Sequence, residues 1–217
     1  MIDIVASGVL FDMDGTLVDS TAVVEAAWTG FGQRHDLDPQ TILAFSHGRQ
    51  TIDTVRHFLP DLDEAEQHRI VDEMIAAEVD NVDGILEVPG AAAFVSRLVD
   101  AGVPVALVTS APRDLAVNRM RAAGVHVPEA LVASEDVDHG KPHPDGYLRG
   151  AALLGVDPTE CAAFEDAPAG LEAAIASGAT TVVVGALEAD VTAGLYRVAG
   201  YDGITVEVEG SAFRIRG

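Results

Sequence analysis

Two groups of acidic residues have the types and spacing that could bind a divalent metal ion. In FDMDGT, Asp12 and Asp14 follow an apolar run and lie two residues apart, so on a strand both side chains point to the same side. In FEDAPAG, Glu165 and Asp166 are adjacent and also follow an apolar run. Carboxylates held this close repel one another, and a cation relieves the repulsion. Mg²⁺ suits them because it prefers oxygen ligands and is commonly held by a few carboxylates together with a substrate phosphate.

Other interpretations of these acidic residues are weaker. A surface turn can also be rich in Asp and Gly, but the apolar run before Asp12 disfavours a simple turn. An EF-hand calcium loop is disfavoured because Thr16 and Leu17 occupy its third ligand position and its glycine position. Asp166 could instead interact with the dipole of the helix that follows it. Two acidic pairs at neighbouring strand ends favour the metal site.

Lys141, in HGKPHPDGY, is the one lysine of a sequence whose other twelve basic residues are arginine. An ammonium group is a compact charge with three donors, whereas guanidinium is planar and larger. Lysine can therefore contact a carboxylate and a phosphate oxygen at once. We expect Lys141 to lie among the acidic residues, where its charge and that of Mg²⁺ offset the carboxylates.

The segment LVTSAPRD places small polar residues at the end of another apolar run. Thr109 or Ser110 is expected to cap a helix that begins at Pro112. Backbone N–H groups at such a helix start also bind phosphate. The segment is therefore either an ordinary helix cap or part of an anion site, and its place beside the acidic residues favours the anion site.

The elements that position these residues follow from the pattern of the chain. Short apolar runs end in polar residues and alternate with alanine-rich helical segments that proline and glycine delimit. This alternation predicts an α/β fold with a doubly wound parallel sheet, in which ligands bind at the carboxyl ends of the strands. The predicted strands are Ile4–Phe11, Val103–Val108, Ala130–Ala133, Cys161–Phe164 and Thr180–Val184. One predicted helix begins after Gly90 and ends before Gly102, another runs from about Pro144 to Gly155, and another follows Pro168 and ends at Gly178.

The alternation lapses between Asp19 and about Asp83, where the sequence is polar and helical. This stretch of some 65 residues is far longer than one strand-to-strand crossover needs, so it predicts an inserted helical cap. The segments AAWTGFGQRH, TIDTVRHFL and DEAEQHRIVDEMIAAEV predict helices within it. The tail from Asp202 predicts one or two edge strands.

Composition limits the kinds of partner. The sequence has 35 acidic and 13 basic residues and a formal net charge of −22, so its surface is expected to repel nucleic acids and anionic membranes. An anionic substrate must then meet a local positive site. The single cysteine, Cys161, excludes an internal disulfide and fits a reducing compartment. We expect a cytoplasmic monomer with no nucleic-acid or membrane partner.

The motifs together resemble those of the haloacid dehalogenase-like (HAD) superfamily of phosphotransferases. Four segments match in the family's order: FDMDGTLVDS, VTS, GKPHPDGY and FEDAPAG. The resemblance implies a Rossmann-like HAD core formed by residues 1–17 and 85–217, with an α-helical cap domain inserted at residues 18–84. The tail after about Glu188 lies outside the resemblance.

The resemblance also implies catalytic roles. Asp12 is expected to be the nucleophile that takes the phosphoryl group as an aspartyl phosphate. Asp14 is expected to protonate the leaving alcohol and then to activate water, while Lys141 offsets charge on Asp12 and on the phosphate. The implied cofactor is Mg²⁺, and its implied ligands are Asp12, the backbone carbonyl of Asp14, Asp166 and, through a coordinated water, Glu165.

Substrate contacts are implied on both the core and the cap. The family's second motif places Thr109, Ser110 and the Ala111 backbone around the phosphate. The cap segment resembles the small helical caps of sugar and polyol phosphatases, especially those acting on 2-deoxyglucose 6-phosphate and glycerol phosphate. It places His47 and Arg49 on a loop that dips into the site, with Arg49 the better candidate for a substrate contact and His47 equally well explained as solvated surface.

The function implied is a Mg²⁺-dependent phosphatase for small phosphate monoesters such as sugar or polyol phosphates. A phosphomutase of the β-phosphoglucomutase type is the alternative, since it shares both core and cap. A signalling receiver domain also gathers acidic residues and a lysine around Mg²⁺, but its motifs come in another order and it has no room for the insert. A catalytically silent binding module is disfavoured because every reactive position is occupied.

Overall fold

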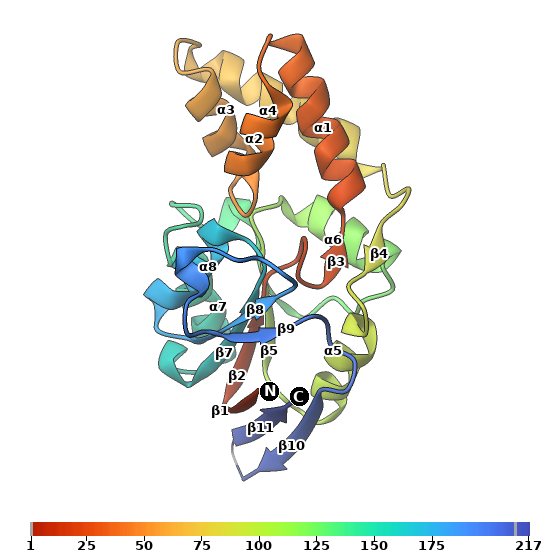
Figure 1. The fold of residues 1–217 in the computed structure, drawn as a ribbon, viewed down its shortest axis with the longest axis vertical. Coiled ribbons are helices and arrows are strands. Elements are labelled where there is room, and N and C mark those ends of the chain that lie inside the picture. The colour runs from red at the N-terminus through yellow and green to blue at the C-terminus, as the bar shows by residue number, and fades with distance from the viewer. Residues whose placement is uncertain (1, 211) are drawn as a thin grey trace.

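The computed structural model describes residues 2–210 and 212–217, which form a parallel sheet covered by helices and a separate group of helices (Figure 1). The sheet has six strands in the order β6-β5-β2-β7-β8-β9, and every neighbouring pair is parallel. The predicted α/β class with a parallel sheet is therefore confirmed. The strands are β2 (Gly8–Phe11), β5 (Val105–Val108), β6 (Ala130–Val132), β7 (Cys161–Glu165), β8 (Thr180–Val184) and β9 (Tyr196–Val198).

Helices cover both faces of the sheet because its central strands are apolar on both sides. Every residue of β2, β5 and β7 is buried, as expected for a parallel sheet between two helical layers. On one face of the sheet, the buried side chains form an apolar cluster that includes Phe94 and Met120. On the other face they form a second cluster that includes Tyr147 and Ala174. The covering helices are α5 (Ala91–Asp100) and α6 (Arg113–Ala122) on the first face and α7 (Asp145–Leu154) and α8 (Pro168–Ser177) on the second.

The separate group of helices lies at one end of the molecule in Figure 1. They enclose an apolar cluster of their own, which includes Trp28, Phe31, Ile42 and Val55. A two-stranded antiparallel ribbon of β3 (Val18–Asp19) and β4 (Leu86–Glu87) joins them to the sheet. The helices are α1 (Thr21–Arg34), α2 (Pro39–Ser46), α3 (Thr51–Phe58) and α4 (Glu64–Val79).

These helices lie within the predicted insert, although its boundaries at residues 18 and 84 stay a prediction. Helix α2 was not among the predicted helices. Its start has a clear signal, because the Asp38 carboxylate accepts hydrogen bonds from the N–H groups of Gln40 and Thr41, and Pro39 occupies the first turn. In the described part of the chain, no helix combines the length and the apolar character that crossing a bilayer requires.

The predicted first strand, Ile4–Phe11, is two strands that belong to different sheets. Strand β1 (Asp3–Ala6) alternates exposed and buried residues and pairs antiparallel with β11 (Ala212–Arg216). Strand β2 is buried throughout and lies in the parallel sheet. The change of burial pattern within one apolar run separates a half-exposed edge sheet from the core.

The last strands of the chain contribute to both sheets. Strands β10 (Thr205–Glu209) and β11 form a three-stranded sheet with β1, in which β11 is central and β10 lies at an edge. The predicted tail strands are thus confirmed, but the edge position holds only for β10, and β9 was not predicted. Between β9 and β10, Tyr201 is fully buried, stacks on Phe94 at 5.1 Å between ring centroids and donates a hydrogen bond to the Thr16 carbonyl at 3.0 Å.

Replacing Tyr201 with Phe should lower the thermal stability, because the Thr16 carbonyl loses a buried donor. An unpaired buried polar group costs roughly 1–3 kcal/mol, and each kcal/mol shifts the melting temperature of a chain of this size by about 2–4 °C. Scanning fluorimetry measures the shift. Tyr196→Phe, at an exposed tyrosine, is the matched control and should melt like the parent; equal melting temperatures for both variants would contradict the role given to the Tyr201 hydroxyl.

Candidate active site

The acidic residues singled out in the sequence and Thr109 lie at the carboxyl ends of three neighbouring strands. Asp12 follows β2, Thr109 follows β5, and Glu165 ends β7, and the sheet order places β2 between the other two. A cavity of about 150 Å³ opens at this edge, about half the lower end of the range for pockets that bind drug-sized ligands. It is lined from the core by Asp12, Asp14, Thr109, Ser110, Arg119 and Asp166, and from the helical group by Trp28, His47, Arg49 and Glu78, among others.

Lys141 lies between two carboxylates at the carboxyl ends of β2 and β7. Its Nζ is 2.5 Å from Asp12 Oδ1 and 2.7 Å from Glu165 Oε1, and it also donates to the Val108 carbonyl at 3.2 Å. The Lys141 side chain is 5% exposed and that of Glu165 is 0% exposed. The structure therefore brings Lys141 to Asp12, as its isolation in the sequence led us to expect.

Glu165 is held by four hydrogen bonds in all. Besides Lys141, its Oε1 accepts from the Tyr147 hydroxyl at 3.1 Å, while Oε2 accepts from the backbone N–H groups of Asp166 and Ala167 at 2.8 and 2.9 Å. Both carboxylate oxygens are thus committed to protein donors. Tyr147 was not among the predicted site residues, although it stands in the quoted segment GKPHPDGY.

Burial disfavours the negative charges of the carboxylates around Lys141 unless a further cation is present. Burial first, and then repulsion from Glu165, raises the pKa of Asp12 to about 8, while Lys141 acts in the opposite direction. The same two causes, with Asp12 added, raise the pKa of Asp166 well above its ordinary value. Burial opposes the charge on Lys141, but attraction to Asp12 and Glu165 outweighs it and raises its pKa.

The surplus of carboxylates fits a divalent ion with oxygen ligands. One carboxylate oxygen each from Asp12, Glu165 and Asp166 lies within 4.8 Å of the others. These three carboxylates, of which those of Asp12 and Glu165 are buried and that of Asp166 is partly exposed, outnumber the one ammonium group and leave an excess negative charge. Every side-chain donor in the set is oxygen, the preference of Mg²⁺. The residues therefore fit the ion that the sequence implied.

The loop after Asp12 is shaped around Asp166. At Gly15 the backbone has a positive φ of 81°, and a Cβ there would lie 2.0 Å from Asp166 Oδ2. Thr16 donates to Asp166 Oδ1 at 3.1 Å. Glycine is required at this position by both the turn and the close approach, so the two acidic motifs fit against each other.

Asp14 contacts a different set of residues from Asp12. Its carboxylate accepts from the Ser20 hydroxyl at 2.6 Å and from Arg119 Nη1, which lies 3.0 Å from each oxygen. Arg119 is only 3% exposed, and its Nη2 donates to Glu78 Oε2 at 2.6 Å. Since Arg119 is on α6 and Glu78 is on α4, the guanidinium links Asp14 to the helical group.

Sequence reasoning missed Arg119, Glu78 and Ser20. Ser20 lies within the quoted motif FDMDGTLVDS, which was a usable signal. Arg119 and Glu78 are 105 and 64 residues from Asp14 along the chain, and nothing in their local sequence marks them as partners of one carboxylate.

The predicted phosphate-binding segment lies at the cavity, but it does not cap a helix as expected. The N-cap of α6 is Pro112, and neither Thr109 nor Ser110 caps it. The helix begins one residue later than predicted because Pro112 adopts an extended conformation. Thr109 Oγ1 instead accepts from the Ala111 N–H at 3.1 Å.

The loop between α2 and α3 closes over this segment. Ser110 donates a hydrogen bond to the Gly48 carbonyl at 2.8 Å. Gly48 has a positive φ of 77°, and a Cβ there would lie 2.9 Å from the Ala167 Cβ. His47 and Arg49 line the cavity on either side of Gly48, and the Arg49 guanidinium lies over the Phe45 ring at 4.5 Å.

Comparison with known proteins identifies relatives across most of the chain. A family model described as haloacid dehalogenase-like hydrolase matches residues 6–178. Hexitol phosphatase A of Escherichia coli K12 is 45% identical over 179 residues, which are 82% of this chain and 83% of that protein. Glycerol-1-phosphate phosphohydrolase 2 of Saccharomyces cerevisiae is 34% identical over 78% of this chain and 70% of its own length.

Among solved structures, β-phosphoglucomutase from Clostridium difficile has a similar fold. It superposes with a TM-score of 0.80 over 90% of this chain and 91% of that one, at 22% sequence identity. At this identity the likeness concerns the fold alone.

Replacing Asp166 with Asn should stabilise the metal-free protein at alkaline pH. Because the folded state raises the pKa of Asp166, the metal-free protein loses stability as pH rises from the ordinary carboxyl value through the raised one. The melting temperature of the variant should therefore exceed that of the parent by more near pH 8 than near pH 5. The expected difference is about 2–4 °C for each kcal/mol of repulsion removed.

Scanning fluorimetry in a chelator, and again with Mg²⁺, tests this difference. Added Mg²⁺ should raise the melting temperature of the parent more than that of the variant. Asp72→Asn, at an exposed aspartate of α4, controls for the change in net charge. Destabilisation by Asp166→Asn in the chelator at both pH values would contradict the charge balance described above.

Proposed function

This chain belongs to the haloacid dehalogenase-like hydrolase family, and we propose that it hydrolyses sugar or polyol phosphates through an aspartyl phosphate on Asp12. It is a phosphatase of small phosphate monoesters, as its relatives are. The observation that carries the finer proposal is the buried contact between Lys141 and Asp12 at a cavity of about 150 Å³. A cavity of that size suits a small phosphorylated substrate.

Hydrolysis is favoured over phosphoryl transfer between sugars. The relatives with the higher sequence identities carry phosphatase names, at 45% and 34% identity. The mutase resembles this chain in fold at 22% identity. A phosphomutase remains the alternative that a requirement for a sugar bisphosphate activator would support.

The first half of the proposed reaction takes place at Asp12. Lys141 donates to Oδ1, so Oδ2 is the oxygen that we assign to attack phosphorus. A bond forms between this oxygen and phosphorus while the bond from phosphorus to the substrate oxygen breaks. We assign Thr109, Ser110 and the Ala111 backbone to the phosphate oxygens. The Ser110 hydroxyl and the Ala111 N–H, which donate to Gly48 and to Thr109 in this structure, would exchange these partners for the phosphate.

The second half returns Asp12 to its starting state. Asp14, which gave its proton to the departing alcohol in the first half, now takes one from a water molecule that attacks phosphorus. The bond from phosphorus to the Asp12 oxygen breaks, and inorganic phosphate is released. Arg119 and Ser20 fix the Asp14 carboxylate by hydrogen bonds. Arg119 is thus a positioning residue for Asp14.

Mg²⁺ is the cofactor that the site residues fit. Asp12, Asp166 and the backbone carbonyl of Asp14 are its proposed ligands, with Glu165 acting through a water molecule. When bound, the ion neutralises charge on the transferring phosphoryl group. Because protein donors already occupy both Glu165 oxygens, the main role that we assign to Glu165 is to hold Lys141 and the loop that follows β7.

The cap residues supply the proposed contacts to the rest of the substrate. Arg49 and His47 line the cavity beside Asp12, and Glu78 adds a carboxylate on the same side. Charged and polar groups of this kind bind hydroxyl groups, which supports a sugar or polyol. That the protein acts as a cytoplasmic monomer without nucleic-acid or membrane partners stays a prediction from its sequence.

A phosphate-release screen with Mg²⁺ over a panel of phosphorylated metabolites tests the substrate class. Sugar and polyol phosphates should be turned over faster than nucleotides. Asp12→Asn should abolish release from every substrate, because the amide is a far weaker nucleophile. Turnover of nucleotides as fast as of polyol phosphates would reject the substrate class, whereas activity retained by Asp12→Asn would reject the mechanism.

Replacing Arg119 with Lys should separate substrates by their leaving groups. The change keeps the charge but loses the planar contact to Asp14, so the loss should fall on the protonation of the departing oxygen. For a polyol phosphate, kcat/KM should drop at least about tenfold, within the range that general acid catalysis contributes. For p-nitrophenyl phosphate, whose leaving group departs without a proton, it should change much less.

Steady-state kinetics on both substrates measures this contrast, since kcat/KM reports phosphoryl transfer to Asp12. Arg121→Lys, on the exposed side of the same helix, is the matched control. Equal losses on the two substrates would assign Arg119 a general structural role in place of positioning Asp14.

A further inference from the structure

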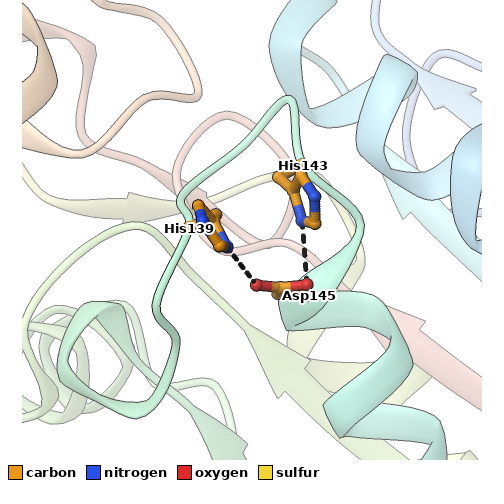
Figure 2. Close-up of side chains that lie close together, drawn as sticks. All are labelled: His139, His143 and Asp145. Atoms are coloured by element: carbon orange, nitrogen blue, oxygen red, sulfur yellow. Dashed lines mark hydrogen bonds and ion pairs between the residues drawn. The ribbon is translucent and has the colours of Figure 1, made fainter.

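A second group of possible metal ligands lies on the loop that carries Lys141. Figure 2 shows the imidazoles of His139 and His143 turned toward one carboxylate, that of Asp145 at the start of α7. His139 Nδ1 lies 3.0 Å from Asp145 Oδ2, and His143 Nδ1 lies 2.8 Å from Asp145 Oδ1. The two rings are 4.7 Å apart between centroids. Three donor atoms, one from each residue, lie within 4.8 Å of one another.

We propose that His139, His143 and Asp145 bind a divalent transition-metal ion of the zinc class. Two imidazole nitrogens and one carboxylate oxygen form a ligand set that Zn²⁺ accepts, with water completing a tetrahedral site. This set differs in kind from the oxygen-only group around Asp12. Because Mg²⁺ takes oxygen ligands, the two sites should bind different ions.

Hydrogen bonding alone explains the arrangement less well than a bound ion. The His139 and His143 side chains are 67% and 52% exposed, and exposed ion pairs contribute little to stability. Such pairs do not by themselves favour convergence of three side chains on one point. The net charge of −22 also attracts cations.

The backbone prepares the three ligands before an ion binds. The His143 N–H donates to the Gly140 carbonyl at 3.0 Å, and this turn brings the rings of His139 and His143 to one side. Gly140 itself is packed against the side chain of Gln50, since a Cβ there would lie 2.9 Å from Gln50 Cγ. A loop fixed in this way loses little further conformational entropy on binding.

The position of the site gives the bound ion a consequence for the loop. Lys141 lies between the two histidines in the sequence, but its side chain is buried against Asp12 while theirs are exposed. An ion on the outer side would therefore hold closed the turn that delivers Lys141 to the catalytic group. This inference does not rest on the proposed reaction, because it concerns binding of a metal ion at an exposed loop.

Isothermal titration of the full chain with ZnCl₂, in saturating Mg²⁺ at neutral pH, tests the proposal. The parent protein should bind one Zn²⁺ beyond the Mg²⁺. His139→Ala and His143→Ala should each weaken this binding by at least about tenfold, the smallest loss typical of residues that merely support a metal ligand. His126→Ala, which removes another exposed histidine, should bind as the parent does.

Two further variants and a spectrum separate this site from the catalytic group. Asp166→Asn should keep the Zn²⁺ affinity of the parent, and X-ray absorption should detect two imidazole ligands in the parent and one in His143→Ala. Both histidine changes are at exposed positions, so circular dichroism should report an unchanged fold. A Kd weaker than about 1 mM in the parent, or binding that survives His143→Ala and is lost in Asp166→Asn, would overturn the proposal.

Discussion

The buried ammonium group of Lys141, shared by Asp12 and Glu165, is the interaction on which the arrangement of this site depends. Three carboxylates gathered at one sheet edge, two of them buried, are unfavourable unless cations lie among them. Lys141 supplies one positive charge, and the oxygen-only group around Asp12 and Asp166 is suited to a second, divalent one. The backbone also leaves room for the Glu165 carboxylate. A Cβ at Gly170 would come within 1.6 Å of Glu165 Oε1, so glycine at this position lets the start of α8 approach that carboxylate closely.

Asp14 is held by a separate interaction, and this division suits its proposed role. Asp12 must be an ionised nucleophile beside cations, whereas Asp14 must exchange a proton. Arg119 places Asp14 in contact with the core and, through Glu78, with the cap. The position of the cap and that of Asp14, the proposed proton donor, are therefore linked by one buried side chain. In the same way, Ser110 joins the proposed phosphate-binding segment to the cap loop at Gly48.

Local patterns predicted the parts of the structure whose causes are local. Polar residues after buried strands located Asp12, Thr109 and Glu165 at one edge, and proline and glycine marked the ends of α5, α7 and α8. The split of Ile4–Phe11 depends on pairing with a strand more than 200 residues away, which an apolar run does not reveal. Arg119 was missed for the same reason, since its partners come from distant segments.

The central claim is that phosphorus becomes covalently attached to Asp12 during turnover. Rapid acid quenching of the enzyme with a substrate labelled with radioactive phosphorus, followed by peptide mapping, measures this directly. The account predicts transient label on the peptide that contains Asp12, lost on treatment with hydroxylamine and not formed in the Asn variant. Label on another residue, or substrate hydrolysis in a single turnover with protein that never becomes labelled, would contradict it.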